Sequence, residues 1–171
     1  NWVESLDFNY IVLKDDDDID ENVNLLLLCG GADFGKRPER DIREHKWFMQ
    51  AYSRVPIVGI CRGMQMANVL LGGTLKDITN ESIIHAAHKD ETVLHIVELL
   101  NGGIFQVNTR HHLAIDEKCV DFKVLAKSQD GVIEMAEAEN SLFVQWHPER
   151  IEVRGTRAET IVSQWIKNKL K

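Results

Sequence analysis

A cysteine between two glycines is the residue of this sequence best placed for nucleophilic chemistry. Cys61 follows the apolar run 57–60 and lies between Gly59 and Gly63. The run predicts a buried strand, and the helix formers at 64–71 predict a helix directly after the cysteine. A nucleophile at such a turn is a nucleophile elbow, in which glycines permit the strained turn and the close approach of strand and helix. The helix N-terminus favours a thiolate, whereas a buried, inert cysteine is the alternative interpretation.

A histidine and a glutamate near the C-terminus have the spacing of a base and the group that orients it. They lie in the segment Gln145-Trp146-His147-Pro148-Glu149. Pro148 favours an extended backbone at His147, and residues two apart in an extended segment point the same way. The carboxylate of Glu149 can therefore orient the His147 imidazole, which can act on the Cys61 thiol.

A glycine pair follows another apolar run, at 25–28. Gly30 and Gly31 come just after this predicted strand, where backbone N–H groups can face a ligand at the carboxyl edge of a sheet. Together with the backbone N–H of Arg62, they are the expected donors to an oxyanion. A tight turn without a ligand is the alternative for the glycine pair.

The elements that must position these residues predict an α/β fold. Strands separated by helices in the first half predict a mostly parallel central sheet flanked by helices, and the strand-rich second half predicts an antiparallel β addition. We expect a single domain over residues 1–171, without its first strand, because 1–6 has the pattern of a helix end. The expected strands are 10–13, 25–28, 57–60, 92–100, 122–128, 132–136 and 142–146, with 75–78 a short strand or a turn and 105–108 extended chain. The expected helices are 41–54, 64–71 and 156–170.

Composition narrows the classes of function. The net charge of -7 gives no basic surface for nucleic acid, and no apolar run is long enough to span a membrane. Three cysteines without CxxC spacing favour free thiols and a reducing, cytoplasmic location, and no signal peptide is recognisable. The acidic run 14–22 lacks the pattern of an EF-hand and predicts a solvated turn. His85 and His88 are expected in a loop, because no third metal ligand is evident.

Taken together, these segments resemble the class I glutamine amidotransferase superfamily. The segment from Gly59 to Gln65 and the segment 145–149 carry the resemblance, which is closest to the γ-glutamyl hydrolase branch, the peptidase C26 type. Three further segments resemble that branch: Leu28-Cys29-Gly30-Gly31-Ala32-Asp33, Arg40-Asp41 with Glu44, and Val107-Asn108-Thr109-Arg110-His111-His112. The resemblance implies a flavodoxin-like α/β domain.

The resemblance also implies the chemistry. Cys61, His147 and Glu149 would form a triad that hydrolyses a γ-glutamyl amide through a γ-glutamyl thioester, with no cofactor and no metal. The residues expected near the γ-glutamyl group of the substrate are Gln65, Asn108, Thr109, Arg110 and His111.

Three functions remain in competition at this point. The first is a free-standing γ-glutamyl hydrolase, whose partner is a small γ-glutamyl substrate. The second is a glutaminase subunit that supplies ammonia to a separate synthetase. The third is a non-catalytic relative that only binds a metabolite or a protein. Neither nucleic acid nor membrane is an expected partner, a homodimer is left open, and the sequence does not identify the amine that would be released.

Overall fold

Three parallel strands lie at the centre of the fold. The structure is a computed structural model that describes residues 2–14, 17–80 and 93–171. Strands β1 (Leu26–Leu28), β2 (Ile57–Ile60) and β9 (Ser141–Val144) pair in parallel, with β2 between the other two. Every residue of β2 and β9 is buried, as is usual for parallel strands covered on both faces.

Antiparallel strands extend this centre beyond β9. Strands β8 (Ile133–Ala138), β7 (Lys123–Ser128), β4 (Val93–Leu99) and β5 (Ile104–Thr109) complete a sheet of order β1-β2-β9-β8-β7-β4-β5. The short strands β3 (Leu75–Asp77) and β6 (Leu113–Ile115) form a separate antiparallel pair. Parallel central strands, flanking helices and an antiparallel addition confirm the predicted fold class.

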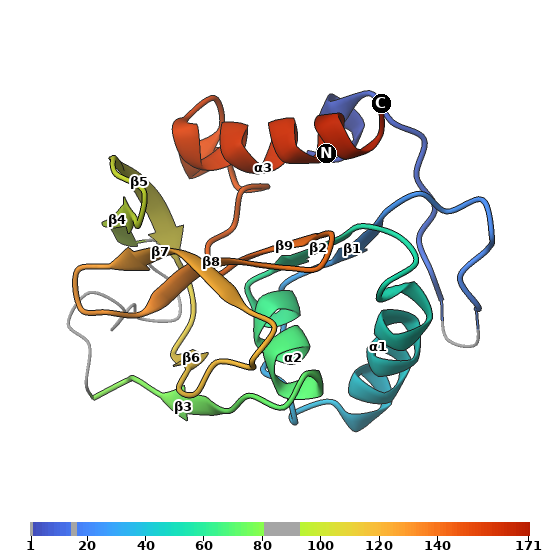
Figure 1. Cartoon of the computed structure of the whole chain (residues 1–171), viewed down its shortest axis with the longest axis horizontal. Coiled ribbons are helices and arrows are strands. Elements are labelled where there is room, and N and C mark those ends of the chain that lie inside the picture. The colour runs from blue at the N-terminus through green and yellow to red at the C-terminus, as the bar shows by residue number, and fades with distance from the viewer. Residues whose placement is uncertain (1, 15–16, 81–92) are drawn as a thin grey trace.

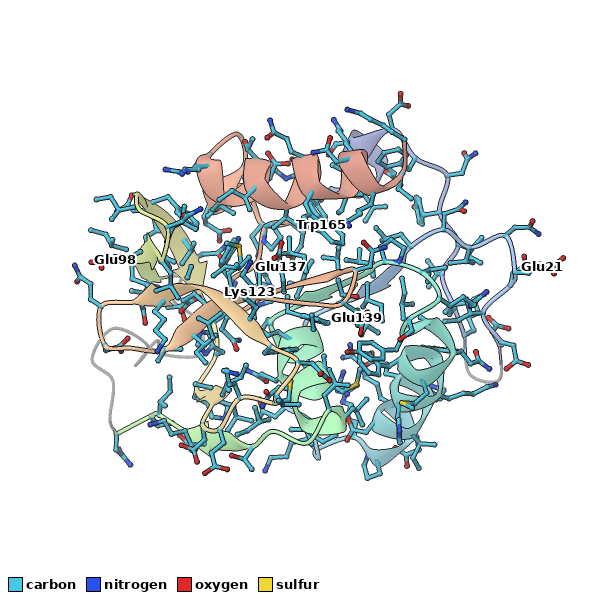
Figure 2. The ribbon with its side chains drawn as sticks, viewed as in Figure 1. Glu21, Glu98, Lys123, Glu137, Glu139 and Trp165 are labelled. Atoms are coloured by element: carbon cyan, nitrogen blue, oxygen red, sulfur yellow. The ribbon has the colours of Figure 1, made fainter. Side chains whose placement is uncertain are left out.

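Helices cover both faces of the parallel strands. Helices α1 (Pro38–Ala51) and α2 (Arg62–Leu70) lie on one face, and α3 (Arg157–Lys169) lies on the other, beside the short 3-10 helix η1 (Glu4–Leu6) (Figure 1). The 3-10 helix η2 (Ile151–Val153) leads into α3. Trp165 projects from α3 toward the sheet, whereas Glu21 lies far out in the loop before β1 (Figure 2).

The alternation of side chains along β2 explains these two layers. Val58 and Ile60 pack in the cluster that includes residues of α3, whereas Ile57 packs in the cluster that includes residues of α1 and α2. Gly59 lies on the α2 side, where an added Cβ would be 2.6 Å from Phe143 Cδ1 and 2.9 Å from the carbonyl carbon of Gly63. The absent side chain therefore lets α2 pack directly on the strand.

Gly63 makes the corresponding contact from the helix, and its substitution should destabilise the protein. A Cβ at Gly63 would overlap the backbone carbonyl oxygen of Leu28, which cannot move aside as a flexible side chain could. We expect Gly63→Ala to lower the free energy of unfolding by about 3 kcal/mol, at the upper end of the usual cost of overpacking. Denaturant titration measures this loss.

Gly72→Ala is the matched control for that variant. Gly72 has φ 94° but open space around an added Cβ, so alanine there introduces backbone strain alone, on the order of 1 kcal/mol. A loss at Gly63 no larger than the loss at Gly72 would contradict the close-packing argument.

The structure corrects several expected boundaries. The predicted strand 10–13 is wrong, because this segment forms no strand and Tyr10, Ile11 and Val12 are 46%, 65% and 69% exposed. Its apolar pattern has no neighbouring strand to pair with among the described residues. The helix expected from 41 begins at Pro38, which is suited to a first turn because proline lacks the N–H that would be unsatisfied there. Strand β6 was not predicted.

The described end of the acidic run, residues 17–22, is exposed except at Ile19 and is attached to α1. Asp18 Oδ1 is 2.8 Å from Lys46 Nζ, and Trp47 Nε1 donates a 2.8 Å hydrogen bond to the backbone oxygen of Asp17. Within the three described ranges, no group of three or more His, Cys, Asp or Glu side chains could hold a metal ion; His85 and His88 lie outside these ranges. Among the helices of the described residues, none has the length and apolar character needed to cross a bilayer.

Candidate active site

Cys61 lies at a strained turn between β2 and α2. Its φ of 51° and ψ of -106° are unusual for a residue with a side chain, and such a conformation costs roughly 1–3 kcal/mol. The surrounding backbone holds the turn: Cys61 N–H donates a 2.7 Å hydrogen bond to Val144 O, and Gln65 N–H donates a 3.1 Å bond to Cys61 O. The structure thus contains the elbow geometry that the glycine spacing predicts.

His147 and Glu149 follow β9 and meet Cys61. The Nδ1 atom of His147 is 2.7 Å from Glu149 Oε1, and the imidazole also forms a hydrogen bond with Cys61. Burial by itself lowers the pKa of His147, but the hydrogen bonds and negative charges of Cys61 and Glu149 outweigh it and raise the pKa to about 9. The imidazole is therefore protonated at neutral pH, with Nδ1 donating to the carboxylate.

Asn108, at the end of β5, fixes the backbone of His147. Its Nδ2 donates a 3.1 Å hydrogen bond to His147 O, and its Oδ1 accepts a 2.8 Å bond from His147 N–H. Strand β5 is at the far end of the sheet from β1, so the sheet must curl to bring β5 against the segment after β9. The Asn108 side chain is fully buried, and its amide is used in holding the histidine.

Gly30 lies directly against both side chains of the thiol and imidazole pair. A Cβ added at Gly30 would be 2.6 Å from His147 Cε1 and 3.6 Å from Cys61 Cβ. The glycine-rich segment after β1 and the elbow after β2 therefore meet at one site, as expected for neighbouring parallel strands. The N–H of Arg62 lies in the first turn of α2, where backbone N–H groups have no acceptor within the helix.

The remaining predicted residues differ in burial and in hydrogen bonding. Gln65 is buried, and its Nε2 donates to Leu113 O at 2.8 Å and to Gln145 Oε1 at 3.3 Å. His111 Nδ1 is 2.9 Å from Leu113 O. The Thr109 hydroxyl is buried without a hydrogen-bond partner among the described residues, and Arg110 is half-buried. Contact of these residues with a substrate stays a prediction.

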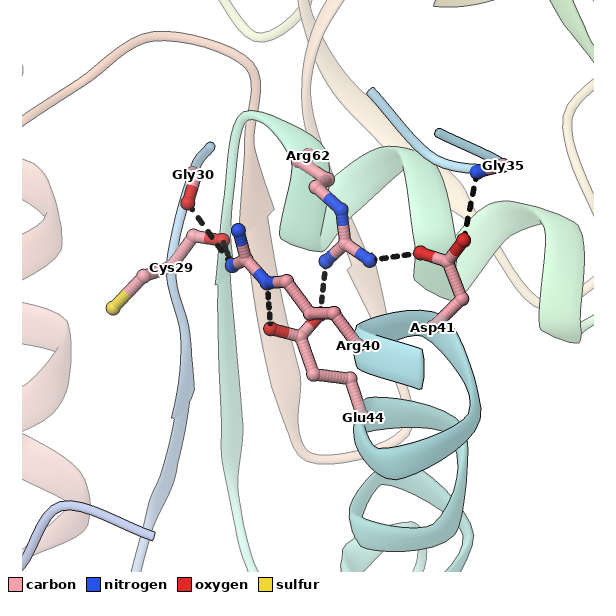
Figure 3. Close-up of polar contacts among 7 residues, drawn as sticks. All are labelled: Cys29, Gly30, Gly35, Arg40, Asp41, Glu44 and Arg62. Atoms are coloured by element: carbon pink, nitrogen blue, oxygen red, sulfur yellow. Dashed lines mark hydrogen bonds and ion pairs between the residues drawn. The ribbon is translucent and has the colours of Figure 1, made fainter. Parts of the chain in front are cut away.

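A buried ion-pair network behind the elbow was not expected. Sequence reasoning used only the backbone N–H of Arg62, yet its side chain is 1% exposed and binds the carboxylates of Asp41 and Glu44 on α1 (Figure 3). Glu44 also binds Arg40, with Arg40 Nε 2.7 Å from Glu44 Oε1. The i,i+4 spacing of Arg40 and Glu44 is a signal for their pairing on a helix, but no spacing links them to Arg62.

The arrangement combines the parts that nucleophilic acyl transfer requires. It has a thiol at a strained turn, a protonated imidazole, a carboxylate that accepts from the imidazole, and a glycine backbone against the thiol. Together these can supply a nucleophile, a proton donor and backbone donors to an oxyanion.

Comparison with known proteins places the chain in a family. The Peptidase C26 family model matches residues 17–149. A Mycobacterium tuberculosis protein assigned by name to the glutamine amidotransferases is 36% identical over 160 residues, covering 76% of this chain and 52% of that protein. The gamma-glutamyl-gamma-aminobutyrate hydrolase of Escherichia coli O157:H7 is 31% identical over 135 residues, covering 66% of this chain and 53% of that enzyme. The chain thus spans about half the length of these two relatives.

A solved structure extends the similarity to the fold. A Thermoplasma acidophilum protein assigned by name to one of the subunits of GMP synthase superposes with a TM-score of 0.69 at 19% identity, covering 87% of this chain and 74% of that one. At this identity the likeness shows a shared fold. Since the family model matches most of the chain and the fold agrees, the chain belongs to the peptidase C26 family, within the class I glutamine amidotransferase superfamily.

Proposed function

We propose that this chain hydrolyses a γ-glutamyl amide and releases glutamate and an amine. The observation that carries the proposal is the placement of Cys61 at a strained elbow, against the same glycine as His147, whose Nδ1 lies 2.7 Å from Glu149 Oε1. The name of the Escherichia coli relative, a hydrolase of a γ-glutamyl compound, supports this substrate class. The reaction requires Cys61 as a free thiol, which favours a reducing location such as the cytoplasm.

The first half of the reaction forms a thioester. The Cys61 thiolate attacks the γ-carbonyl carbon, and the N–H groups of Gly30, Gly31 and Arg62 donate to the oxyanion that develops on the carbonyl oxygen. The intermediate collapses as the C–N bond breaks, and the His147 imidazolium donates its proton to the leaving nitrogen. The amine departs neutral, and a γ-glutamyl thioester remains on Cys61.

The second half returns the enzyme to its starting state. Neutral His147 now takes a proton from a water molecule, whose oxygen attacks the thioester carbon. The second intermediate breaks its C–S bond, releasing the Cys61 thiolate and the γ-carboxyl group of glutamate, which loses its proton to solvent. Glu149 stabilises the imidazolium in both halves without taking a proton itself.

Asn108 should matter for this reaction through His147. Asn108→Ala leaves a buried N–H and a buried C=O of His147 without their partners, and each unmet group costs about 1–3 kcal/mol. We expect kcat to fall roughly 10-fold or more, because the imidazole loses its fixed position. The matched control is Gln106→Ala, which removes an exposed amide from the same strand and should leave kcat unchanged. Steady-state kinetics measure kcat for both variants. Equal kcat values for Asn108→Ala and Gln106→Ala would contradict a positioning role of Asn108.

A panel of γ-glutamyl amides tests the proposed function. The purified protein is incubated without any partner with γ-glutamyl-γ-aminobutyrate, γ-glutamyl amino acids, a γ-glutamyl anilide and glutamine, and released glutamate is measured. We expect steady release from at least one γ-glutamyl amide, with glutamine a poor substrate. A hydrolase needs no gate, so its oxyanion donors should be preorganised in the isolated protein.

The second candidate is a glutaminase subunit, favoured by the glutamine amidotransferase name of the Mycobacterium relative. In that case the protein alone would be inert on the whole panel and would cleave glutamine only when its synthetase is added. That outcome would overturn the hydrolase proposal. No glutamate release under either condition, with a folded protein and a slow-reacting Cys61, would instead favour a non-catalytic binding protein.

A further inference from the structure

Arg40 contacts the glycine segment from the side away from the thiol. Its Nη2 atom donates hydrogen bonds to two successive backbone carbonyls, Cys29 O at 3.2 Å and Gly30 O at 3.1 Å (Figure 3). We propose that Arg40 is a positioning residue that aims the N–H groups of Gly30 and Gly31 at the carbonyl oxygen of the substrate. The inference rests on the proposed function, because an oxyanion forms only if the site performs acyl transfer.

The geometry of the peptide unit carries the argument. The C=O of Cys29 shares its peptide unit with the N–H of Gly30, and the C=O of Gly30 shares its unit with the N–H of Gly31. Both units are trans, so each N–H points opposite to its own C=O. A guanidinium that holds both carbonyls therefore turns both N–H groups away from Arg40. A side chain built on Gly30 would lie against His147 and Cys61, so this segment borders the site, and the inference is that the N–H groups turned away from Arg40 face it.

The fit between Arg40 and Gly31 supports a dedicated contact. Gly31 has φ 145°, and a Cβ built there would overlap Arg40 Nη1. The guanidinium thus packs directly against the backbone, in space that only glycine leaves open. Arg40 can reach the two carbonyls only because Gly31 combines this backbone conformation with the lack of a side chain.

Arg40 is itself held by the network behind the elbow. Its Nε is 2.7 Å from Glu44 Oε1, and the other carboxylate oxygen of Glu44 binds Arg62, the residue that follows the nucleophile. Arg62 also binds Asp41, whose second oxygen accepts a 2.9 Å hydrogen bond from Gly35 N–H. The network joins the start of α1, the elbow and both ends of the glycine-containing loop, so the three proposed oxyanion donors are positioned by one set of charges.

Arginine and lysine should not be equivalent at this position. The guanidinium donates to Glu44 through Nε and to two carbonyls through Nη2, a fixed fork that a lysine ammonium cannot reproduce. The Arg40 side chain is 24% exposed. In a variant without the guanidinium, water can therefore form part of the hydrogen bonds that Arg40 makes to the two carbonyls and to Glu44. We therefore expect substitution to disorient the donors more than it unfolds the protein.

The test compares Arg40→Met with Arg37→Met. Arg37 is exposed, precedes α1 and makes no capping bond with its side chain, so its variant removes the same charge without touching the loop. We expect Arg40→Met to lower kcat by about 10²-fold, the lower end of the effect of losing one oxyanion donor, with KM changed much less. Arg40→Lys should recover only a small part of this loss, and Arg37→Met should match the unsubstituted protein.

Alkylation of Cys61 separates positioning from general damage. Iodoacetamide reacts with a thiolate by displacement and forms no oxyanion, so its rate with Cys61 should change by less than about twofold in Arg40→Met. Added guanidinium at millimolar concentration should restore part of kcat in Arg40→Ala. A parallel loss of alkylation and turnover, or an unchanged kcat in Arg40→Met, would overturn the inference.

A second measurement distinguishes failure of the proposed hydrolase function from failure of the positioning role of Arg40. If the unsubstituted protein releases no glutamate from any substrate, the amide proton shifts of Gly30 and Gly31 in nuclear magnetic resonance spectra still test the positioning role. We expect both to move in Arg40→Met and not in Arg37→Met. Unchanged shifts at both glycines would overturn the inference whatever the activity.

Discussion

Replacement of Cys61 by alanine should reduce glutamate release to background, a loss on the order of 10⁴–10⁶-fold in kcat. Alanine removes the only atom of the site that can form the thioester, while His147, Glu149 and the backbone donors remain in place. Because Cys61 is buried at 6% exposure and alanine is smaller, the fold should persist. Glutamate release and the thermal unfolding midpoint are measured together, so that loss of activity is not confused with loss of structure.

Selective alkylation gives the same prediction a second readout. Partial desolvation raises the pKa of the Cys29 thiol, with a further contribution from the Glu149 charge, and burial raises the pKa of Cys119. Both should be protonated at pH 7 and slow to react. Cys61 forms its hydrogen bond with a protonated imidazole, so iodoacetamide should label it far faster. Equal labelling of the three cysteines in the folded protein would count against an activated nucleophile.

Removal of the imidazole should have the second largest effect. We expect His147→Ala to lower kcat by about 10²–10⁴-fold, the usual contribution of a general acid and base. The leaving nitrogen then has no proton donor, and the Cys61 thiolate loses its positively charged partner. Retention of more than half of the activity would remove His147 from the mechanism.

The pH dependence should identify the same residue. The pKa of His147 is raised to about 9, so kcat/KM should fall as the pH rises through about 9 and the proton donor is lost. Glu149→Gln removes one of the groups that raise this pKa, so the descending limb should shift to lower pH. The loss of activity at pH 7 should be smaller than in Cys61→Ala. An unshifted limb with full activity would exclude Glu149 from the site.

The same raised pKa links folding stability to pH. Proton binding is stronger in the folded state than in the unfolded chain, where the pKa of histidine is 6.5. The stabilisation is therefore complete below about pH 6.5 and is lost as the pH rises toward 9. This loss runs parallel to the loss of activity, so the pH profile should be measured with stability at each pH.

The sequence by itself determined the local geometry of the two reactive segments. Gly59 and Gly63 around Cys61 predict an elbow, because strand and helix can approach closely only where side chains are absent, and the structure has that close approach. The spacing of His147 and Glu149 predicts that their side chains meet, and His147 Nδ1 lies 2.7 Å from Glu149 Oε1. The extended backbone expected there is wrong, because residues 147–150 form a turn in which Arg150 N–H donates to His147 O at 3.3 Å. These features depend on neighbours in sequence, which pattern and spacing describe directly.

The order of elements also predicted the fold class. Apolar runs at β1 and β2, separated by a helical pattern, indicated parallel strands, and the hairpin of β7 and β8 indicated the antiparallel addition. The parallel pairing of β9 with β2 was not predicted. The apolar segment 10–13 has a comparable pattern but forms no strand. An apolar pattern indicates that a segment is able to form a strand. The strand forms only where another strand lies beside it in the fold and supplies backbone hydrogen bonds.

Only the tertiary structure decided how the site is supported. Asn108 reaches His147 because the sheet curls across four intervening strand pairings, and Arg62 reaches Asp41 and Glu44 because α2 packs beside α1. Arg40 reaches the carbonyls of Cys29 and Gly30 because α1 packs beside the segment that follows β1. These contacts join residues 10 to 39 positions apart. They follow from the curvature and packing of whole elements, which no local pattern of side chains encodes.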